Sequence, residues 1–388
     1  MDLTDTSVKN IINVVDQFDY STQNDSYNNK FREWRKNKHN PYAFNFKLNR
    51  KESVFVEGKG FEKKSAAASE QDTVSKIMNI AGIAMLIWIF IENILGRIMV
   101  AFCDLLGMDV HTSFFSTNIY GEGAAIALII ISVVKVFIPV MYIHRKLKMP
   151  RKVEFMTTMN HAFDMFGAIF MSLAVSAVAS LPNIYTNNTR QVFNYFRDIN
   201  SDASVWGQEQ FILYTVFDII VLSVISELFF RGAIFGALRQ FGDLFAIIVT
   251  TAMSVLLVQD LREMPAALMI SAVASVGILR SGSIFTAIFV QVIYKMYRLA
   301  LVILEQSSPD TVFLKRNSFI LATFLVGVAG FAFLYLIGKK QKHHRIAKYT
   351  SEISDKQRLA IAVKSFPVPA VACICLLAAL IKFVLSVI

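Results

Sequence analysis

The chain has 388 residues, of which 55% are hydrophobic and 18% are charged, and its net charge is +10. A soluble domain averages about 45–50% apolar and about 25% charged residues, so a chain with a mean hydropathy of +0.49 does not fit one water-soluble core. The composition therefore excludes a cytosolic enzyme, a secreted disulfide scaffold and a disordered chain. The basic residues lie between apolar runs, which indicates a role in topology and contact with membrane lipids, with no nucleic-acid partner. Reduced thiols are expected at Cys103, Cys373 and Cys375, which lie in apolar surroundings.

Residues 1–75 are predicted to form a basic, aromatic-containing cytoplasmic tail, because they contain no run long enough to cross a bilayer. Residues 28–64 hold eleven Lys or Arg against four Glu. Five aromatic residues are interleaved with the first of these charges: Phe31, Trp34, Tyr42, Phe44 and Phe46. This pattern is typical of a segment that lies on the membrane surface. A partly ordered tail without a partner is the alternative.

The apolar runs that follow predict an all-α fold, a polytopic transmembrane helix bundle of about eight or nine spans. The candidate spans are 77–97, 123–143, 160–181, 211–231, 244–258, 264–280, 283–305, 318–338 and 366–387. The fifth and sixth are short for a bilayer. We divide the chain after the tail into N-terminal transmembrane helices (76–210), a helical core (211–305) and C-terminal transmembrane helices (306–388).

The charges of the loops predict the orientation. The loop Arg145–Lys152 has five Lys or Arg and no acid, and the loop that begins at Lys339 is also basic, whereas residues 107–122 carry acids and no Lys or Arg. Because basic loops stay in the cytoplasm, we expect a multi-pass cell-membrane protein with a cytoplasmic N-terminus and an external C-terminus.

Ionisable residues inside the predicted spans are candidate functional residues. Each costs about 2.5–3.5 kcal/mol at a helix centre, so such groups face the bundle interior and pair with one another. Glu227 and Arg231 are four residues apart on one helix face, the spacing at which an acid before a base pairs best. The other candidates are Glu92, Lys135, Asp164, Asp218 and Lys295.

The segment SVISELFFRGAIFGALRQFG resembles the first signature of the CPBP family (CAAX protease and bacteriocin-processing, also called ABI) of intramembrane proteases. That signature is Glu-Glu-x-x-x-Arg, often followed by Gly, and it corresponds to Ser226–Gly232. Thr250–Gln259 occupies the place of the second signature, Phe-x-x-x-His. Leu279–Lys295 resembles the third, in which Arg-x-Gly-Ser leads to His-x-x-x-Asn. The resemblance makes residues 211–305 a CAAX-protease-like core.

The first signature is kept only in part. In the family the first Glu activates water, and Ser226 stands at that position. The supporting second Glu and the Arg match Glu227 and Arg231. Serine cannot take a proton from water without a base of its own, so activity at these motif positions is in doubt.

The other two signatures have lost their catalytic groups. The Phe and His of the second fall on Val255 and Gln259, and the His and Asn of the third fall on Gln291 and Lys295. An amide keeps a hydrogen-bond donor and acceptor but does not replace imidazole as a metal ligand or proton carrier. We expect Glu227, Arg231, Gln259, Gln291 and Lys295 to form a buried polar network, in which Lys295 is attracted to Glu227. No cofactor or metal ligand is expected.

Three functions follow as alternatives. The first is a non-catalytic CPBP homologue, or pseudoenzyme, that binds or regulates another membrane protein or a lipidated or hydrophobic peptide. The second is an active intramembrane endopeptidase that uses Glu227 near the cytoplasmic face, with zinc as its cofactor; a cage of Glu227, His161 and Asp164 would favour it. The third is a transporter or channel, favoured by a polar lumen through Glu92, Lys135 and Asp218.

Overall fold

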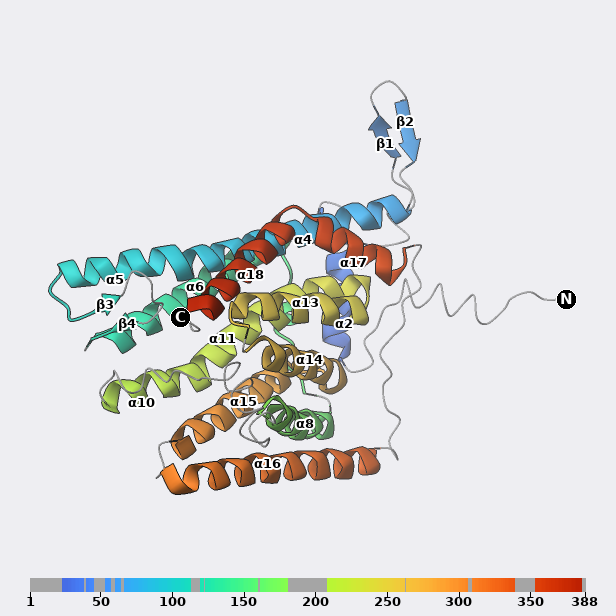
Figure 1. Cartoon of the computed structure of the whole chain (residues 1–388). Coiled ribbons are helices and arrows are strands. Elements are labelled where there is room, and N and C mark those ends of the chain that lie inside the picture. Colours follow the sequence, from blue (N-terminus) through green and yellow to red (C-terminus); the bar gives the residue numbers. More distant parts are fainter. Residues whose placement is uncertain are drawn as a thin grey trace.

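The structure is a computed structural model of the chain, and Figure 1 shows a bundle of long helices. It describes residues 23–37, 40–44, 53–56, 60–63, 66–112, 119–121, 123–159, 161–180, 208–261, 263–305, 309–338 and 353–385. Its helices are α2 (Asp25–Lys36), α4 (Ala66–Phe90), α5 (Gly96–Leu105), α6 (Ala124–Leu147), α7 (Arg151–Glu154), α8 (Ala162–Ser180), α10 (Gln208–Val216), α11 (Ser223–Glu227), α12 (Phe235–Leu238), α13 (Asp243–Val258), α14 (Met264–Ser281), α15 (Ile284–Glu305), α16 (Pro309–Gly338), α17 (Asp355–Lys364) and α18 (Pro367–Leu385). Two short antiparallel hairpins pair β1 (Ser53–Val56) with β2 (Gly60–Lys63) and β3 (His111–Thr112) with β4 (Ile119–Tyr120).

Within the described residues, 8 helical segments are long and apolar enough to cross a membrane. They are Ala67–Leu105, Ala124–Leu147, Ala162–Ser180, Glu209–Phe241, Met264–Ser281, Ile284–Leu304, Leu314–Ile337 and Pro367–Val384. The predicted fifth span is α13, which is apolar but has only 16 residues, about 24 Å at 1.5 Å per residue. The predicted all-α polytopic bundle of about eight or nine spans is confirmed.

Two of these segments are longer than predicted, and both contain π-helical turns. Within the first, η1 (Ile91–Leu95) joins α4 to α5. Within the fourth, η4 (Phe217–Leu222) and η5 (Leu228–Ile234) flank α11, and a 3₁₀ turn, η6 (Arg239–Phe241), ends the helix. A π turn adds a residue and re-aims the side chains after it, and such turns are frequent at functional sites. One charged residue of interest lies in each: Glu92, Asp218 and Arg231.

Close helix contacts depend on glycine. A Cβ at Gly327 on α16 would lie 2.5 Å from the backbone nitrogen of Ala174 on α8. A Cβ at Gly232 in η5 would lie 3.1 Å from the carbonyl oxygen of Glu154 on α7. Small residues let backbones approach closely in membrane bundles, and Gly232 thereby places the loop after α6 directly against the helix that carries Glu227.

The tail contains a helix that packs into the bundle. The side chain of Asn24 caps α2 by accepting a hydrogen bond from the Tyr27 N–H at 2.8 Å. Phe31 is 0% exposed, and Trp34 and Phe44 are also buried in the main hydrophobic core. The hypothesis that these aromatic residues lie on the membrane surface is therefore wrong for the three, because protein surrounds them; Tyr42 is partly buried, and Phe46 lies outside the described residues.

Hydrogen bonds fix the same segment to loops far away in the sequence. Trp34 Nε1 donates to the carbonyl oxygen of Leu147 at 3.1 Å. The Gln240 amide donates to the carbonyl oxygen of Tyr42 at 3.0 Å and accepts from the N–H of Phe44 at 2.8 Å. Residues 23–44 consequently cover the end of the bundle where α6 and the fourth span finish.

Charge is distributed unequally over the two ends of the bundle. Figure 1 shows α2 and α17 at one end, and the start of α10 together with the α15–α16 turn at the other. The end with α2 carries five exposed cations of the loop after α6: Arg145, Lys146, Lys148, Arg151 and Lys152. The basic loop after α6 is the one from which a cytoplasmic N-terminal tail was predicted, and α2 belongs to that tail.

A buried acid at this end gives a prediction about pH. Glu154 is 1% exposed and lies 2.6 Å from His144 Nδ1. Burial raises the pKa of Glu154, and the hydrogen bond and charge of His144 offset only part of that rise. The carboxyl therefore holds its proton to higher pH in the folded chain than in the unfolded one, so its stabilising contribution is present below the unfolded pKa and is lost as the pH rises through the folded pKa.

We expect Glu154→Gln to raise the melting temperature at neutral pH, because burial raises the pKa of Glu154 and so disfavours its charged form in the folded chain. The gain should shrink as the pH falls toward the ordinary Glu range, about 4–5. Thermal unfolding of the detergent-purified protein across that range checks this, with Glu33→Gln as an exposed control. A gain that is independent of pH would contradict the assignment.

Candidate functional site

A cavity of about 480 Å³ lies between the fourth span and the helices α13, α14 and α15. Its lining combines aromatic and aliphatic side chains with three acids and three bases. The lining residues are Phe211, Tyr214, Thr215, Asp218, Ile219, Ser226, Glu227, Phe230, Arg231, Ser254, Val258, Glu263, Ala267, Ile270, Ser271, Gln291, Tyr294, Lys295, Arg298, Leu299 and Val302. Cavities of this size with a few convergent polar groups are the usual form of a ligand site.

The innermost part of the cavity is built on the predicted Glu–Arg pair. Arg231 Nη1 donates to Glu227 Oε1 at 3.1 Å, and both side chains are almost completely buried. Arg231 Nη2 also donates to the carbonyl oxygen of Ser271 at 2.9 Å, and the Ser254 hydroxyl donates to that of Ser271 at 2.6 Å. The Arg231 guanidinium thus links the fourth span to α14, and the hydrogen bond from Ser254 links α13 to α14.

One of the two carboxylate oxygens of Glu227 makes no ordinary hydrogen bond within the described part of the chain. This oxygen, Oε2, is buried and accepts no hydrogen bond of ordinary geometry from the described residues, although Gln291 lies beside the carboxylate. A buried carboxylate oxygen without a donor is costly, so a donor on an occupant of the cavity would be favoured at this point. Ser226, at the position of the first catalytic Glu, also lines the cavity, and its hydroxyl donates to the carbonyl oxygen of Ser223 at 3.2 Å.

Lys295 does not pair with Glu227, which corrects the prediction. Its Nζ donates to Asp218 Oδ1 at 2.7 Å and to the Asp218 carbonyl oxygen at 2.8 Å. The π turn η4 places Asp218 closer to the ammonium group than Glu227, which Arg231 already neutralises. Lys295 therefore joins α15 to the start of the fourth span.

A third ion pair was missed by the sequence reasoning. Arg298 Nη2 donates to Glu263 Oε1 at 2.8 Å, and both line the cavity together with Tyr294. Arg298 lies one turn after Lys295 inside the predicted seventh span, so the presence of a second cation on one face of that helix was the available signal. Glu263 lies in the short connection before α14 and carried no signal by itself.

Gln259, the last residue of the second signature, does not join the network in which it was predicted to lie. Gln259 follows the end of α13 in a left-handed conformation, with φ of 51°, and turns away. Its amide donates to Glu92 Oε2 and accepts from Asn93 Nδ2, both at 3.4 Å. The five residues expected in one network therefore belong to three sets of contacts: Glu227 and Arg231 with Gln291 beside them, Lys295 with Asp218, and Gln259 with Glu92 and Asn93. Neither Val255 nor Gln259 lines the cavity, whereas Ser254 does.

The other predicted intramembrane charges, Glu92, Lys135 and Asp164, are also paired. Lys135 Nζ lies 2.7 Å from Glu92 Oε1, and neither residue lines the cavity, so the lumen proposed through these residues and Asp218 is not formed by them. Asp164 pairs with Arg280 at 3.1 Å. No group of three His, Cys, Asp or Glu that could hold a metal occurs in the described part of the chain, so the cage with His161 is not found there.

The donor set of the cavity does not fit a divalent metal. Each of its three carboxylates has a cation of its own, so the lining is charge-balanced, and an added divalent ion would face the three fixed cations. At an effective dielectric constant of about 20, two unit charges about 4 Å apart interact by about 4 kcal/mol. The described part of the lining also offers no imidazole or thiol, the ligands that zinc prefers.

Comparison with known proteins supports the family resemblance. Residues 208–297 match the family described as type II CAAX prenyl endopeptidase Rce1-like, which confirms the predicted resemblance for this part of the chain. No match was found among curated proteins or solved structures. The chain thus combines an Rce1-like segment of the CAAX-protease family with multiple apolar helices of a membrane protein.

Proposed function

We propose that this protein is a non-catalytic relative of the CAAX proteases. It would bind another membrane protein, or a hydrophobic or lipidated peptide, in the cavity beside Glu227. The observation that carries the proposal is the charge balance of the lining: Glu227, Asp218 and Glu263 are each occupied by an Arg or Lys. Peptide hydrolysis needs a group that passes a proton to the leaving amine, most often a histidine; the described lining residues include no imidazole, and each of their carboxylates is held by a cation.

The apolar part of the lining supports a peptide or lipid chain as the occupant. Phe211, Ile219, Leu299 and Val302 lie along the cavity, and Tyr214 adds a ring with a polar tip. Burial of apolar area stabilises binding by about 25 cal/mol per Å², while the ion pairs leave no net charge to attract a strongly ionic ligand. We place the protein in the cell membrane with a cytoplasmic N-terminus, in line with its basic end.

One observation favours the second candidate, an intramembrane endopeptidase. Glu227 lines the cavity, and its buried Oε2 accepts no hydrogen bond of ordinary geometry from the described residues, which leaves a lone pair for a water molecule. In that case Glu227→Gln would abolish cleavage of a CAAX-type or hydrophobic peptide by the purified protein. Cleavage that depends on Glu227 would overturn the non-catalytic proposal.

A cavity-filling substitution tests the binding function. Ala267 lines the cavity on α14, while the neighbouring Leu268 is 51% exposed on the outer side of the same helix. We expect Ala267→Trp to abolish complementation of a strain that lacks the protein and to weaken crosslinking to its membrane partner, because the indole occupies the site. Leu268→Trp should preserve both.

Expression must be equal for the two variants, as judged by quantitative immunoblotting, and their melting temperatures should be compared. Full activity of a folded Ala267→Trp variant would show that the cavity is not the binding site. Loss of activity in Leu268→Trp as well would assign the effect to the helix surface instead.

A further inference from the structure

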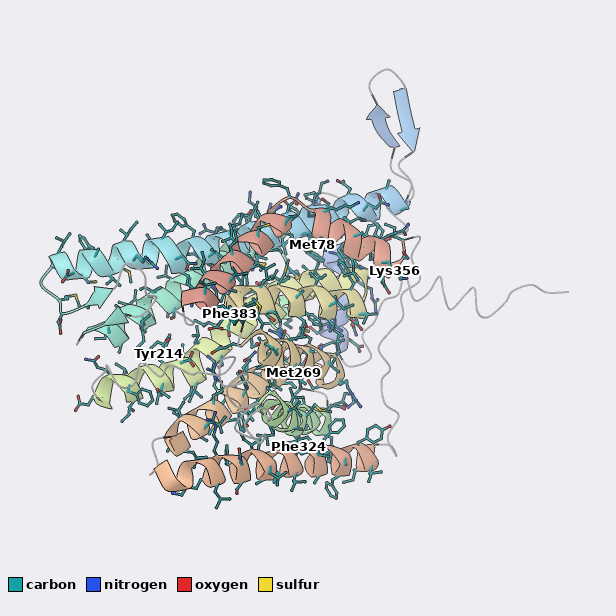
Figure 2. All side chains as sticks on the ribbon, viewed as in Figure 1. Met78, Tyr214, Met269, Phe324, Lys356 and Phe383 are labelled. Carbon is teal, nitrogen blue, oxygen red and sulfur yellow. The ribbon has the colours of Figure 1, made fainter. Side chains whose placement is uncertain are left out.

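The cavity occupies only one end of the bundle. Its lining on the fourth span begins at Phe211, near the start of α10, and stops at Arg231; on α15 it extends from Gln291 to Val302. Figure 2 places Tyr214, a lining residue, toward the end of the bundle where α10 begins, and Lys356 on α17 at the opposite end. Glu227 and Arg231 are therefore the innermost groups, and the cavity extends from them away from α2.

Toward the α2 end, the space between these helices is filled by packed side chains. Phe235 and Phe241 are at most 2% exposed and continue the fourth span beyond the cavity. The N-terminal segment then covers their ends: the Gln23 amide donates to the carbonyl oxygen of Gly282, and Arg239 Nη1 donates to the Tyr27 hydroxyl at 3.4 Å. A ligand from the α2 end would have to displace this packing to reach Glu227.

The charges of the loops assign a side of the membrane to each end. The α2 end bears the basic loop Arg145–Lys152, whereas the connection 107–122 at the other end has acids and no Lys or Arg. Short loops rich in Lys and Arg remain on the cytoplasmic side. The end at which the cavity lies is therefore external.

We infer that the cavity is reached from the external side of the membrane, and that its occupant is a polypeptide segment which places an N–H donor on Glu227 Oε2. Glu227 Oε2 accepts no hydrogen bond of ordinary geometry from the described residues, so a donor at this point would be favoured, and the balanced ion pairs favour a neutral one such as a backbone amide. The nature of the occupant rests on the proposed function. The side of access follows from geometry and loop charge alone.

Accessibility of single cysteines tests the side of access. In a background with Cys103, Cys373 and Cys375 replaced by alanine, Leu299→Cys places a thiol in the cavity wall, and Tyr214→Cys provides a second position. We expect a membrane-impermeant maleimide to label both in intact cells several-fold faster than in inverted vesicles. Lys36→Cys, at an exposed position at the end of α2, should show the reverse.

Met296→Cys is the matched control on α15, because Met296 is 52% exposed on the outside of the bundle and does not line the cavity. A thiol in lipid is not ionised and should react slowly from either side. Faster labelling of the cavity cysteines from the cytoplasmic side would overturn the inference, as would protection from both sides with reaction only in detergent. Labelling from outside without any peptide binding would leave the access route standing and refute the proposed occupant.

Discussion

Replacement of Arg231 by methionine is expected to destabilise the protein by about 3–5 kcal/mol, because it leaves a buried carboxylate without its counter-charge. Arg231 and Glu227 have side chains that are 0% and 1% exposed, respectively. The methionine would also remove the hydrogen bond to the Ser271 carbonyl oxygen. Denaturation of the protein in detergent or bicelles, followed by tryptophan fluorescence, measures the change.

Two further variants separate the charge from the packing. The double variant Glu227→Gln/Arg231→Met should recover most of the lost stability, because no uncompensated ion remains. Lys76→Met breaks a pair of the same spacing on α4, but its side chains are 43% and 42% exposed, so we expect a cost of at most about 1 kcal/mol. An equal cost for Lys76 and Arg231 would show that burial of the pair is not the cause.

Phe31→Ala is expected to have an effect of similar size, about 3–5 kcal/mol, since it deletes a fully buried ring from a well-packed core. Phe31 is 0% exposed and lies between Tyr27 and Trp34, with ring centroids 6.1 and 6.0 Å away. The variant should also release the N-terminal segment, so that limited proteolysis cuts residues 23–44 faster than in the wild type.

Glu33→Ala is the control on the same helix, because its side chain is 68% exposed and makes only a surface pair with Lys30. It should change stability by less than about 1 kcal/mol. Unchanged stability and protease resistance in Phe31→Ala would mean that the N-terminal segment is an accessory tail, as its composition suggested.

The bundle and the Glu227–Arg231 pair were predictable because both depend on local rules. Apolar runs of sufficient length become helices in a membrane, where every backbone group must be bonded internally. Residues four apart on a helix meet whatever surrounds them. The family resemblance added the position of Ser226 and Gln291, both of which line the cavity.

The partners of Lys295 and Gln259 were not predictable in the same way. The attraction of Lys295 to Glu227 was inferred from a motif alignment, but the π turn that carries Asp218 offers a carboxylate at 2.7 Å. Gln259 was placed in the same network by the same alignment, but it follows the end of α13 at Val258 in a left-handed conformation and bonds to Glu92 and Asn93. No residue pattern in the sequence predicts a π turn, or a glutamine in the left-handed conformation at the C-terminal cap of a helix.

The sequence by itself determined that this is a helical membrane protein with a CAAX-protease-like segment, because hydropathy and motif identity are properties of short stretches. Only the tertiary structure decided which charges neutralise one another, that α2 is part of the core, and at which end of the bundle the cavity lies. Those features depend on residues tens to hundreds of positions apart, and their energy comes from burial and pairing that exist only once the helices have packed.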